Sequence, residues 1–193
     1  KKRPIGDGST ITLAEGLTPP GVASMVATAW QDDGTILYEM PGATLMRIPD
    51  VGGLADTVAV YSDQGFTNLA WVGGLPESRG ALVTLCPGPC AGGLSLLVAD
   101  FEADTTRLLL DDVARGWYTP TGQLIYVRTD GAVFAAPFDL DALELTGPGL
   151  PLFEGVQLNT STPELAVAWD GTVLYATGEQ TNQGSRELIW VDR

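Results

Sequence analysis

The chain contains 24 acidic residues and no histidine, so the chemistry open to it is mainly that of carboxylates. Without histidine, Ser-His-Asp and Cys-His mechanisms are excluded, as are zinc and non-haem iron sites that use His ligands. Two carboxylates could hydrolyse a glycosidic bond, but only when a cleft holds them about 5–10 Å apart. Because acids are so abundant, their number selects no pair. We therefore expect no catalytic residue and no cofactor, with a carboxylate-based glycosidase or lyase as the alternative.

One acidic cluster could in principle hold a cation, because Asp139, Asp141 and Glu144 lie within six residues. The cluster lacks the glycine and the ligand spacing of an EF-hand loop. Aspartate also favours turns, and Leu143 and Leu145 could anchor such a turn on a core. We expect a connection between two strands and no metal site, with a cation site as the alternative.

The two cysteines, Cys86 and Cys90, enclose the tripeptide Pro-Gly-Pro. Cysteines at this spacing across a turn can close a small disulfide loop, which would fit an oxidising compartment. A zinc site needs about four ligands, and no histidine is present to complete one. We expect a structural disulfide. Free thiols and a redox or metal-binding pair stay open, because thiol reactivity depends on exposure and pKa.

These residues must be positioned by a repeating unit that occurs four times along the chain. Each copy has an apolar strand led by an aromatic residue, a polar turn with glycine, and a second strand rich in Leu, Val and Tyr. The turn glycines are 46, 42 and 49 residues apart, a period typical of β-propeller blades when the unit is built only of strands. The copies are AWQDDGTILYEM from Ala29, AWVGGLPESRGALVTL from Ala70, GWYTPTGQLIYVRT from Gly116 and AVAWDGTVLYAT from Ala166, with turn glycines Gly34, Gly80, Gly122 and Gly171.

Each repeat continues into a third strand, and the first three continue into a fourth, outer strand. No stretch has a helical spacing of apolar residues long enough to predict a helix. We therefore predict an all-β fold, a β-propeller of about four four-stranded antiparallel blades in a single domain, 1–193. The expected third strands are 44–50, 95–101, 132–139 and 187–193, the fourth strands are 56–61, 105–111 and 148–155, and the blades are 22–61, 66–111, 116–155 and 165–193.

The fourth repeat ends at its third strand, so its outer strand must come from elsewhere. Residues 9–16 resemble the outer strands of the other repeats, and pairing Ile11 and Leu13 beside Leu188 and Trp190 would close the ring. Closure would hide strand edges that otherwise recruit other chains. Two alternatives remain: strand exchange between copies, giving a homo-oligomer or filament, and a piece of a larger ring.

The repeat resembles the TolB-like propeller repeats, relatives of WD repeats in bacterial periplasmic and cell-surface proteins. The segment 107–156 is most similar to the propeller region that follows the kinase and membrane span of many bacterial serine/threonine kinases, and TVLYATG near the C-terminus is similar to the same set. The resemblance implies a non-catalytic propeller outside the cell membrane that binds proteins or ligands. The chain itself has no kinase signature.

Four tryptophans, Trp30, Trp71, Trp117 and Trp169, occupy equivalent places in the four repeats. An exposed ring can stack on a sugar, but a feature shared by every blade is more simply explained by packing between blades. We expect these rings in the core.

A binding surface is predicted from connectivity. In a four-stranded meander, loops joining one blade to the next share a face with the loops between second and third strands, and binding residues concentrate in loops. We name this surface the loop face; it comprises residues 63–66, 86–90, 111–115, 128–130, 157–164 and 179–186. Arg115 and Arg128 are its foremost cations, since a guanidinium serves recognition well, although pairing with neighbouring acids is the alternative. The candidate binding residues are Asp63, Phe66, Asp111, Arg115, Arg128, Asp130, Glu164 and Arg186.

Composition and charge limit the partners. The formal net charge is −14, which repels phosphate backbones and anionic membranes, so nucleic acid is not expected as a partner. The longest apolar run, 94–99, is too short to cross a bilayer. The chain begins Lys1-Lys2-Arg3 without a methionine or signal peptide, which suggests processing or a longer parent. We expect an extracytoplasmic module that binds a protein or small ligand.

Overall fold

The computed structural model describes residues 2–3, 8–13, 27–88, 90, 93–168 and 170–178. These residues form antiparallel sheets joined by short turns, so the all-β prediction is confirmed. Two short 3-10 helices occur in connections, η1 (Ser62–Gln64) and η2 (Pro76–Ser78). Within the described ranges, no helix combines the length and apolar character that a bilayer crossing requires.

The first two blades are four-stranded meanders in which each strand pairs with the next. Their strands are rich in leucine and in β-branched or aromatic residues and are bounded by Gly, Pro and Asp, which favours short strands and tight turns. Blade one consists of β1 (Thr28–Trp30), β2 (Thr35–Met40), β3 (Thr44–Pro49) and β4 (Asp56–Val60). Blade two consists of β5 (Asn68–Gly74), β6 (Gly80–Cys86), β7 (Ser95–Asp100) and β8 (Thr105–Asp111).

Blade three repeats the meander but divides its outer strand in two. Both outer pieces pair with β11, one at each end, and the shorter piece was not predicted. The strands are β9 (Val113–Thr119), β10 (Gln123–Arg128), β11 (Val133–Asp139), β12 (Glu144–Leu145) and β13 (Leu150–Phe153).

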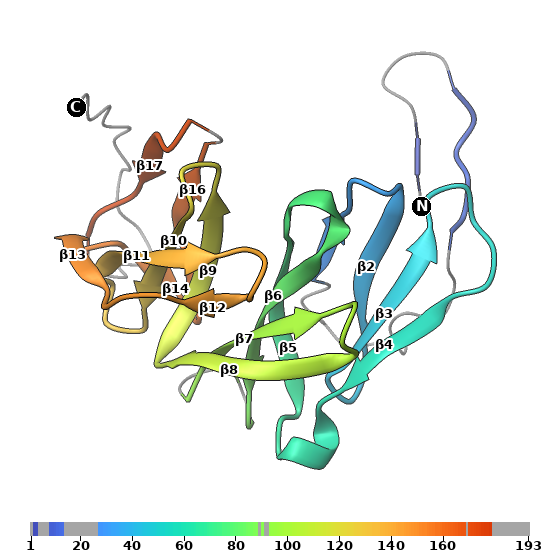
Figure 1. Ribbon diagram of the computed structural model, residues 1–193, viewed down its shortest axis with the longest axis horizontal. Coiled ribbons are helices and arrows are strands. Elements are labelled where there is room, and N and C mark those ends of the chain that lie inside the picture. The colour runs from blue at the N-terminus through green and yellow to red at the C-terminus, as the bar shows by residue number, and fades with distance from the viewer. Residues whose placement is uncertain are drawn as a thin grey trace.

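The fourth repeat contributes a hairpin of β16 (Leu165–Val167) and β17 (Val173–Tyr175). A second small hairpin, β14 (Leu158–Asn159) with β15 (Thr162–Pro163), precedes it and was not predicted. The predicted third strand, 187–193, lies outside the described residues. Figure 1 shows the blades following one another along an arc, with blade one and the β16–β17 hairpin at opposite ends.

Apolar side chains between adjacent blades form the core. One buried cluster joins blades one and two through residues such as Leu37, Leu45 and Leu85, and a second joins blades two and three through Leu96 and Leu124. A third cluster joins blade three to the last hairpins. Because each blade covers one face of its neighbour, the blades stack as the repeat pattern predicted.

The turn glycines have two different roles. Gly34, Gly122 and Gly171 have φ values of 78°, 75° and 84°, so they occupy the left-handed turn position that glycine tolerates best. Gly80 does not: it is the first residue of β6, and a Cβ atom there would lie 2.3 Å from the Ala99 carbonyl oxygen. The prediction of Gly80 as a turn glycine is therefore wrong. Glycine is required at position 80 because β7 passes too close to leave room for a side chain.

The predicted blade limits shift slightly. The first described strand of blade one starts at Thr28, and residues 22–26 of its predicted range lie outside the described residues. The third blade starts earlier than predicted, because β9 starts at Val113 and not at 116. The described part of the predicted 9–16 strand bridges back on the chain itself, because Ile11 pairs with Lys2. Leu188 and Trp190, its predicted partners, lie outside the described residues.

The tryptophans do not behave as a uniform core set. Trp30 is 57% exposed, so its prediction as a core ring is wrong, and Lys2 Nζ lies 5.0 Å from its ring centroid. Trp71 and Trp117 are half-buried and pack at the edges of two different inter-blade clusters. Trp169 lies outside the described residues.

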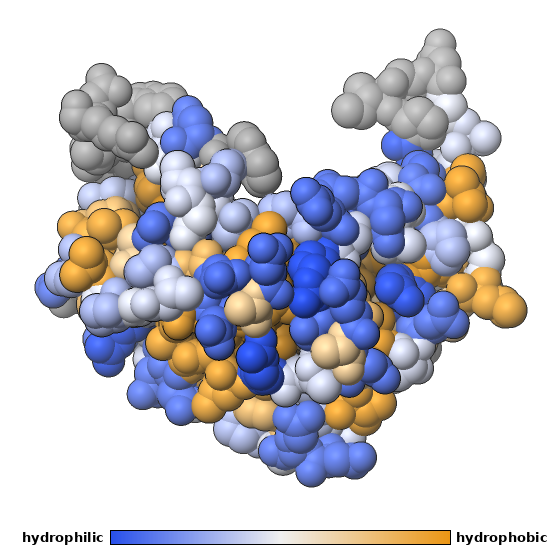
Figure 2. Space-filling view, in the orientation of Figure 1, coloured by the Kyte–Doolittle hydropathy of each residue, from blue (hydrophilic) through white to orange (hydrophobic). Residues whose placement is uncertain are grey.

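Exposed apolar residues gather at two margins of the molecule. Figure 2 shows a mainly hydrophilic surface in this view, with hydrophobic groups over the β3–β4 connection and over β13. Val51 and Leu54 are exposed in the first region, and Leu150 and Leu152 in the second.

Candidate functional site

The structure brings the loop-face segments together by backbone hydrogen bonds that tie the connections between blades to the turns between second and third strands. The Thr67 amide donates to the Cys86 carbonyl (2.9 Å), and the Val113 amide donates to the Leu94 carbonyl (3.3 Å). Further along the chain, the Thr129 amide donates to the Asp112 carbonyl (2.9 Å), and the Val156 amide donates to the Gly131 carbonyl (3.1 Å). Loops that are far apart in the sequence are therefore tied into one continuous surface.

The Cys86–Cys90 segment is closed by a disulfide, as predicted. Cys86 is fully buried at the end of β6, and Asn68 Nδ2 donates to the Gly88 carbonyl at 2.9 Å. The disulfide and this hydrogen bond hold the loop against the start of β5, so the loop is part of the same surface.

The predicted candidate residues have different environments on this face. Asp63 is exposed in η1, whereas Phe66 packs against the cluster between blades one and two. Asp111 accepts a hydrogen bond from Ser95 Oγ at 2.9 Å. Glu164 is half-buried between β15 and β16, with its backbone amide donating to Gln157. Arg186 lies outside the described residues.

Arg128 and Asp130 form an exposed ion pair. Arg128 Nη2 lies 3.7 Å from Asp130 Oδ2, and the two side chains are 45% and 56% exposed. Asp130 also accepts a hydrogen bond from the Ala132 amide. Pairing with a neighbouring acid, the alternative for Arg128, is therefore what the structure shows. Exposed pairs of this kind contribute little to stability.

Arg115 has no such partner. No carboxylate of the described residues lies within ion-pair distance of it. Its guanidinium carbon instead lies 4.7 Å from the Trp71 ring centroid and 4.8 Å from that of Trp117. The Nε atom is buried without a hydrogen-bond partner. Burial lowers the pKa of Arg115 to about 10, which still leaves the group charged at neutral pH.

Local sequence explains how this cation and the two rings meet. Arg115 and Trp117 alternate along β9, so both side chains lie on the same face of blade three. Trp71 reaches them from β5, where an irregularity between Leu69 and Trp71 shifts the strand register. The Trp71 ring lies against Gly73, where a Cβ atom would come 2.3 Å from the ring. Only glycine leaves room for the ring in this position.

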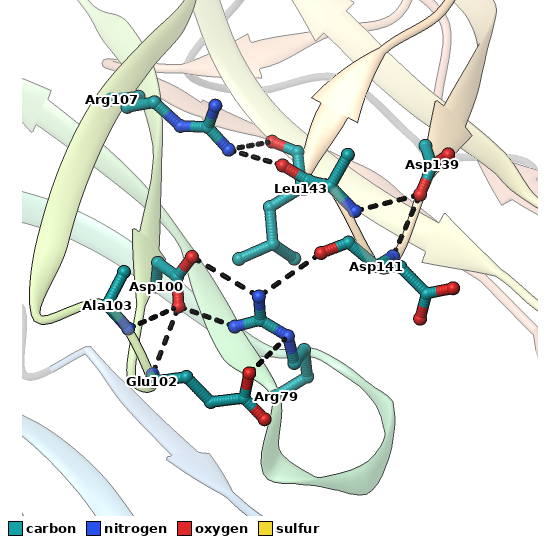
Figure 3. Close-up of polar contacts among 9 residues, drawn as sticks. Arg79, Asp100, Glu102, Ala103, Arg107, Asp139, Asp141 and Leu143 are labelled. Carbon is teal, nitrogen blue, oxygen red and sulfur yellow. Dashed lines mark hydrogen bonds and ion pairs between the residues drawn. The ribbon is translucent and has the colours of Figure 1, made fainter.

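The opposite face of the molecule carries a polar joint between blades two and three that the sequence analysis missed. Arg79 pairs with both carboxylate oxygens of Asp100 and donates to the Asp141 carbonyl at 3.1 Å (Figure 3). Arg107 donates to the carbonyls of Ala142 and Leu143. We name these six residues and Asp139 the arginine joint. The arginine hydrogen bonds and the backbone amides of Glu102 and Ala103 lower the pKa of Asp100 to about 2.

The acidic cluster at 139–144 is a turn, as expected, and belongs to this joint. Asp139 Oδ1 accepts hydrogen bonds from the backbone amides of Asp141 (2.9 Å) and Ala142 (2.8 Å). Leu143 is fully buried and anchors the turn in the core. Within the described residues no three His, Cys, Asp or Glu side chains are placed to share a metal ion.

Among the described residues, Glu39 is the carboxyl group with a raised pKa. Glu39 is half-buried between blades one and two, and desolvation raises its pKa, partly offset by hydrogen bonds from the backbone amides of Leu69 and Ala27. Its Oε1 accepts from the Leu69 amide at 3.3 Å. Glu39 thus has a contact that joins the two blades.

A groove of about 280 Å³ lies between blades one and two, and Gln64 of the loop face is among its lining residues. Its walls come from β4 and from the β7–β8 turn. Arg47 lies over the Phe101 ring at one side, 5.8 Å from the centroid. The groove is open and is lined by short side chains such as Thr57, Ala59 and Thr105.

Comparison with known proteins bears on the fold. No protein-family profile and no curated protein matches the chain in sequence. TolB from Acinetobacter baumannii superposes with a TM-score of 0.60 at 15% identity, over 84% of this chain and 39% of TolB. The tricorn protease superposes with a TM-score of 0.54 at 11% identity, over 84% of this chain and 15% of the protease. The computationally designed Ika4 protein gives a TM-score of 0.52 at 10% identity, over 93% and 99% of the two chains.

The chain therefore spans about two fifths of the length of TolB and a smaller share of the protease. At these identities the likeness concerns the fold alone. Sequential four-stranded meanders, stacked face to face, agree with it. The chain accordingly has a β-propeller fold similar to that of TolB.

Proposed function

We propose that the chain is a non-catalytic, extracytoplasmic binding module that recognises a protein or small ligand through its loop face. The observation that carries the proposal is the assembly of this face. Backbone hydrogen bonds between its connections and turns, together with a disulfide, hold its loops in one arrangement. Pre-organised loops lose less conformational entropy on binding, which favours affinity.

The placement of the acids supports a non-catalytic role. A glycosidase requires two carboxyl groups facing a cleft, one of them with a raised pKa. Within the part of the chain that the structure describes, the carboxyl group with a raised pKa is that of Glu39, and it accepts a backbone hydrogen bond in the contact between two blades. Asp100 and Asp139, which accept several hydrogen bonds each, stabilise turns.

The disulfide and the net charge support the cellular setting and the partner class. Disulfides persist in oxidising compartments, which agrees with a periplasmic, surface or secreted protein. A net charge of −14 disfavours nucleic acid and anionic membranes and leaves proteins and small ligands as partners.

The test is a selection of binding peptides from a randomised display library on the immobilised chain. Hydrogen–deuterium exchange of the chain with the selected peptides then maps the contact. We expect protection in 61–67, 111–115 and 128–132, and none in the opposite turns 100–104 and 139–143. Peptides that protect only the opposite turns, or a selection that enriches none, would contradict the proposal.

Two charge reversals provide the matched comparison. Asp63→Lys alters an exposed acid on the loop face, and Glu144→Lys alters an exposed acid on β12 at the opposite face. Both change the net charge by the same amount. Binding should weaken several-fold in the Asp63 variant and stay unchanged in the Glu144 variant.

A further inference from the structure

Arg115 differs from the other basic residues whose contacts the structure describes. Arg47 lies over a single ring, that of Phe101. Lys2, Arg79, Arg107 and Arg128 each have an oxygen partner from a carboxylate or a carbonyl. Arg115 has none among the described residues, although the chain carries 24 acids. Its guanidinium group instead contacts the aromatic rings of Trp71 and Trp117.

The two rings leave one side of the guanidinium free. Their centroids lie 6.1 Å apart and their planes are inclined by 47°. If the rings lay on opposite sides of the guanidinium, the distance between their centroids would equal the sum of the two centroid-to-guanidinium distances, 4.7 and 4.8 Å. The observed distance between the centroids is much shorter than that sum. Both rings therefore lie toward the same side of Arg115 and form a wedge against it. A ligand can approach from the other side.

The hydrogen-bonding groups on that side are unused. Nε is buried without a partner, whereas the terminal nitrogens are not among the buried atoms that lack partners. Since they also make no hydrogen bond with the described residues, they face solvent. A guanidinium presents its N–H groups in one plane, which suits a carboxylate that binds through both oxygens.

Charge selects a carboxylate over a phosphate. A phosphate group carries close to two negative charges at neutral pH, and the field of a chain with net charge −14 opposes it more strongly than a single charge. Arg115 is also a cation packed against two indole rings that lie on one side of it, so its surroundings favour an anion with an apolar neighbour.

We propose that Arg115, backed by Trp71 and Trp117, binds the carboxylate of a ligand with an adjoining apolar group. The carboxylate could belong to a small organic acid or to the C-terminus of a peptide. This inference rests on the proposed binding function and names the chemistry of one contact within it.

The experiment uses sodium hexanoate and hexanamide as probes, which share a chain and differ in charge. The indole N–H signals of Trp71 and Trp117 are followed by NMR during titration of the whole chain and are assigned with single Trp→Phe variants. We expect saturable shifts of both signals with hexanoate and none with hexanamide. Equal shifts with both probes, or no saturation with hexanoate, would overturn the proposal.

Variants separate binding from folding. Arg115→Gln should weaken hexanoate binding at least about tenfold, the loss expected for a charge-assisted hydrogen bond. Arg115→Lys keeps the charge and should retain part of the affinity. Arg47→Gln removes an equal charge from an arginine of β3, outside the loop face, and should bind like the parent chain. If Arg115→Gln fails to fold, the comparison of the two probes on the parent chain still decides the matter.

Two further measurements identify the source of the carboxylate and test the Arg115 contact separately from the proposed binding function. An acetylated tetrapeptide ending in leucine is compared as free acid and as amide. Tighter binding of the free acid than of hexanoate indicates a peptide C-terminus, and comparable binding indicates a small acid. If library peptides still bind the loop face of Arg115→Gln with full affinity, the binding function stands and the carboxylate contact is wrong.

Discussion

Arg115 is a residue whose surroundings lower the cost of a half-buried charge without neutralising it. Each indole face contributes about 0.5–2 kcal/mol to a nearby cation, depending on how far the pair is desolvated. A carboxylate side chain in place of the indole rings would pair with the arginine and occupy its N–H groups. The wedge of Trp71 and Trp117 thus holds the guanidinium in position while its hydrogen-bonding capacity stays available.

Gly73 supports this arrangement, and its replacement gives a direct test. We expect Gly73→Ala to displace the Trp71 ring, because the new Cβ would lie 2.3 Å from it. Overpacking of this kind costs about 1–3 kcal/mol. Urea unfolding should show the loss, and the near-ultraviolet circular dichroism of the tryptophans should change.

Gly88→Ala is the control, since no atom lies within 4 Å of a Cβ built there. It should unfold at nearly the same urea concentration as the parent chain. Unchanged stability and an unchanged tryptophan spectrum in Gly73→Ala would show that the ring does not depend on this glycine.

The arginine joint operates at the scale of the strands and turns. Two side chains of blade two, from Arg79 and Arg107, bind the main chain of a turn in blade three. Asp100 completes the joint by holding Arg79 and by accepting two backbone amides of the β7–β8 turn. The joint thereby connects the ends of two hairpins on the face opposite the loop face.

The joint should make stability depend on pH in a defined window. The folded pKa of Asp100 is about 2 against an ordinary value of 3.8, so the fold favours the ionised form. Its contribution is fully present above the unfolded pKa and is lost as the pH falls from about 4 to about 2. Asp100→Asn should lower the free energy of unfolding by about 1.5–3 kcal/mol at neutral pH.

The measurement is urea unfolding of the parent chain and the variant between neutral pH and pH of about 2. The difference between them should shrink through the acid window. Glu144→Gln, an exposed acid on the neighbouring hairpin, should follow the parent chain at every pH. A difference between parent and Asp100→Asn that is constant with pH would contradict the assigned pKa.

Much of the element scale could be predicted from sequence, and the reasons are local. Strands such as β2 and β10 are runs of apolar and aromatic residues that end at a polar turn with glycine, which is a short-range signal. Connectivity then predicted the loop face, and cysteine spacing predicted the disulfide. The β12 and β14 pairings, of two residues each, are too short for periodicity to indicate.

The site and the joint were harder to predict, because their partners are distant or are main-chain atoms. Arg115 could be singled out as a loop-face cation, but its contact with Trp71 depends on how two blades pack. The equal spacing of the tryptophans indicated a common core role, which Trp30 contradicts with 57% exposure. The contacts of Arg79 and Arg107 could not be predicted, because their acceptors include main-chain carbonyl groups, which every residue type has.

At the scale of the whole molecule, the blades are stacked through three buried clusters, each shared by neighbours. Stability in such an array is approximately a sum of blade and interface contributions. The two margins with exposed apolar residues lie on blade one and blade three. Ring closure and a homo-oligomer formed by exchange of terminal strands both involve residues 179–193 and stay predictions.

The acidity of the molecule gives a prediction for its stability in salt. A net charge of −14 opposes the compact state through self-repulsion, and salt screens charges over about 10 Å at 0.1 M ionic strength. Raising sodium chloride from about 0.01 to 0.3 M at neutral pH should therefore raise Tm by a few degrees.

Differential scanning calorimetry at two pH values provides the control. Near the sequence pI of about 4.1 the net charge is close to zero, so the same salt series should change Tm much less. An equal rise at both pH values would assign the effect to surface hydration and not to charge repulsion.

The arginine joint has a final consequence for how such repeats can diverge. Arg107 and one terminal nitrogen of Arg79 bind carbonyl groups of the 139–143 turn, and every residue type supplies a carbonyl. Substitutions at Asp141 or Ala142 therefore leave the acceptors in place as long as the turn keeps its shape. The sequences of neighbouring blades can therefore diverge while the distance between the blades stays the same.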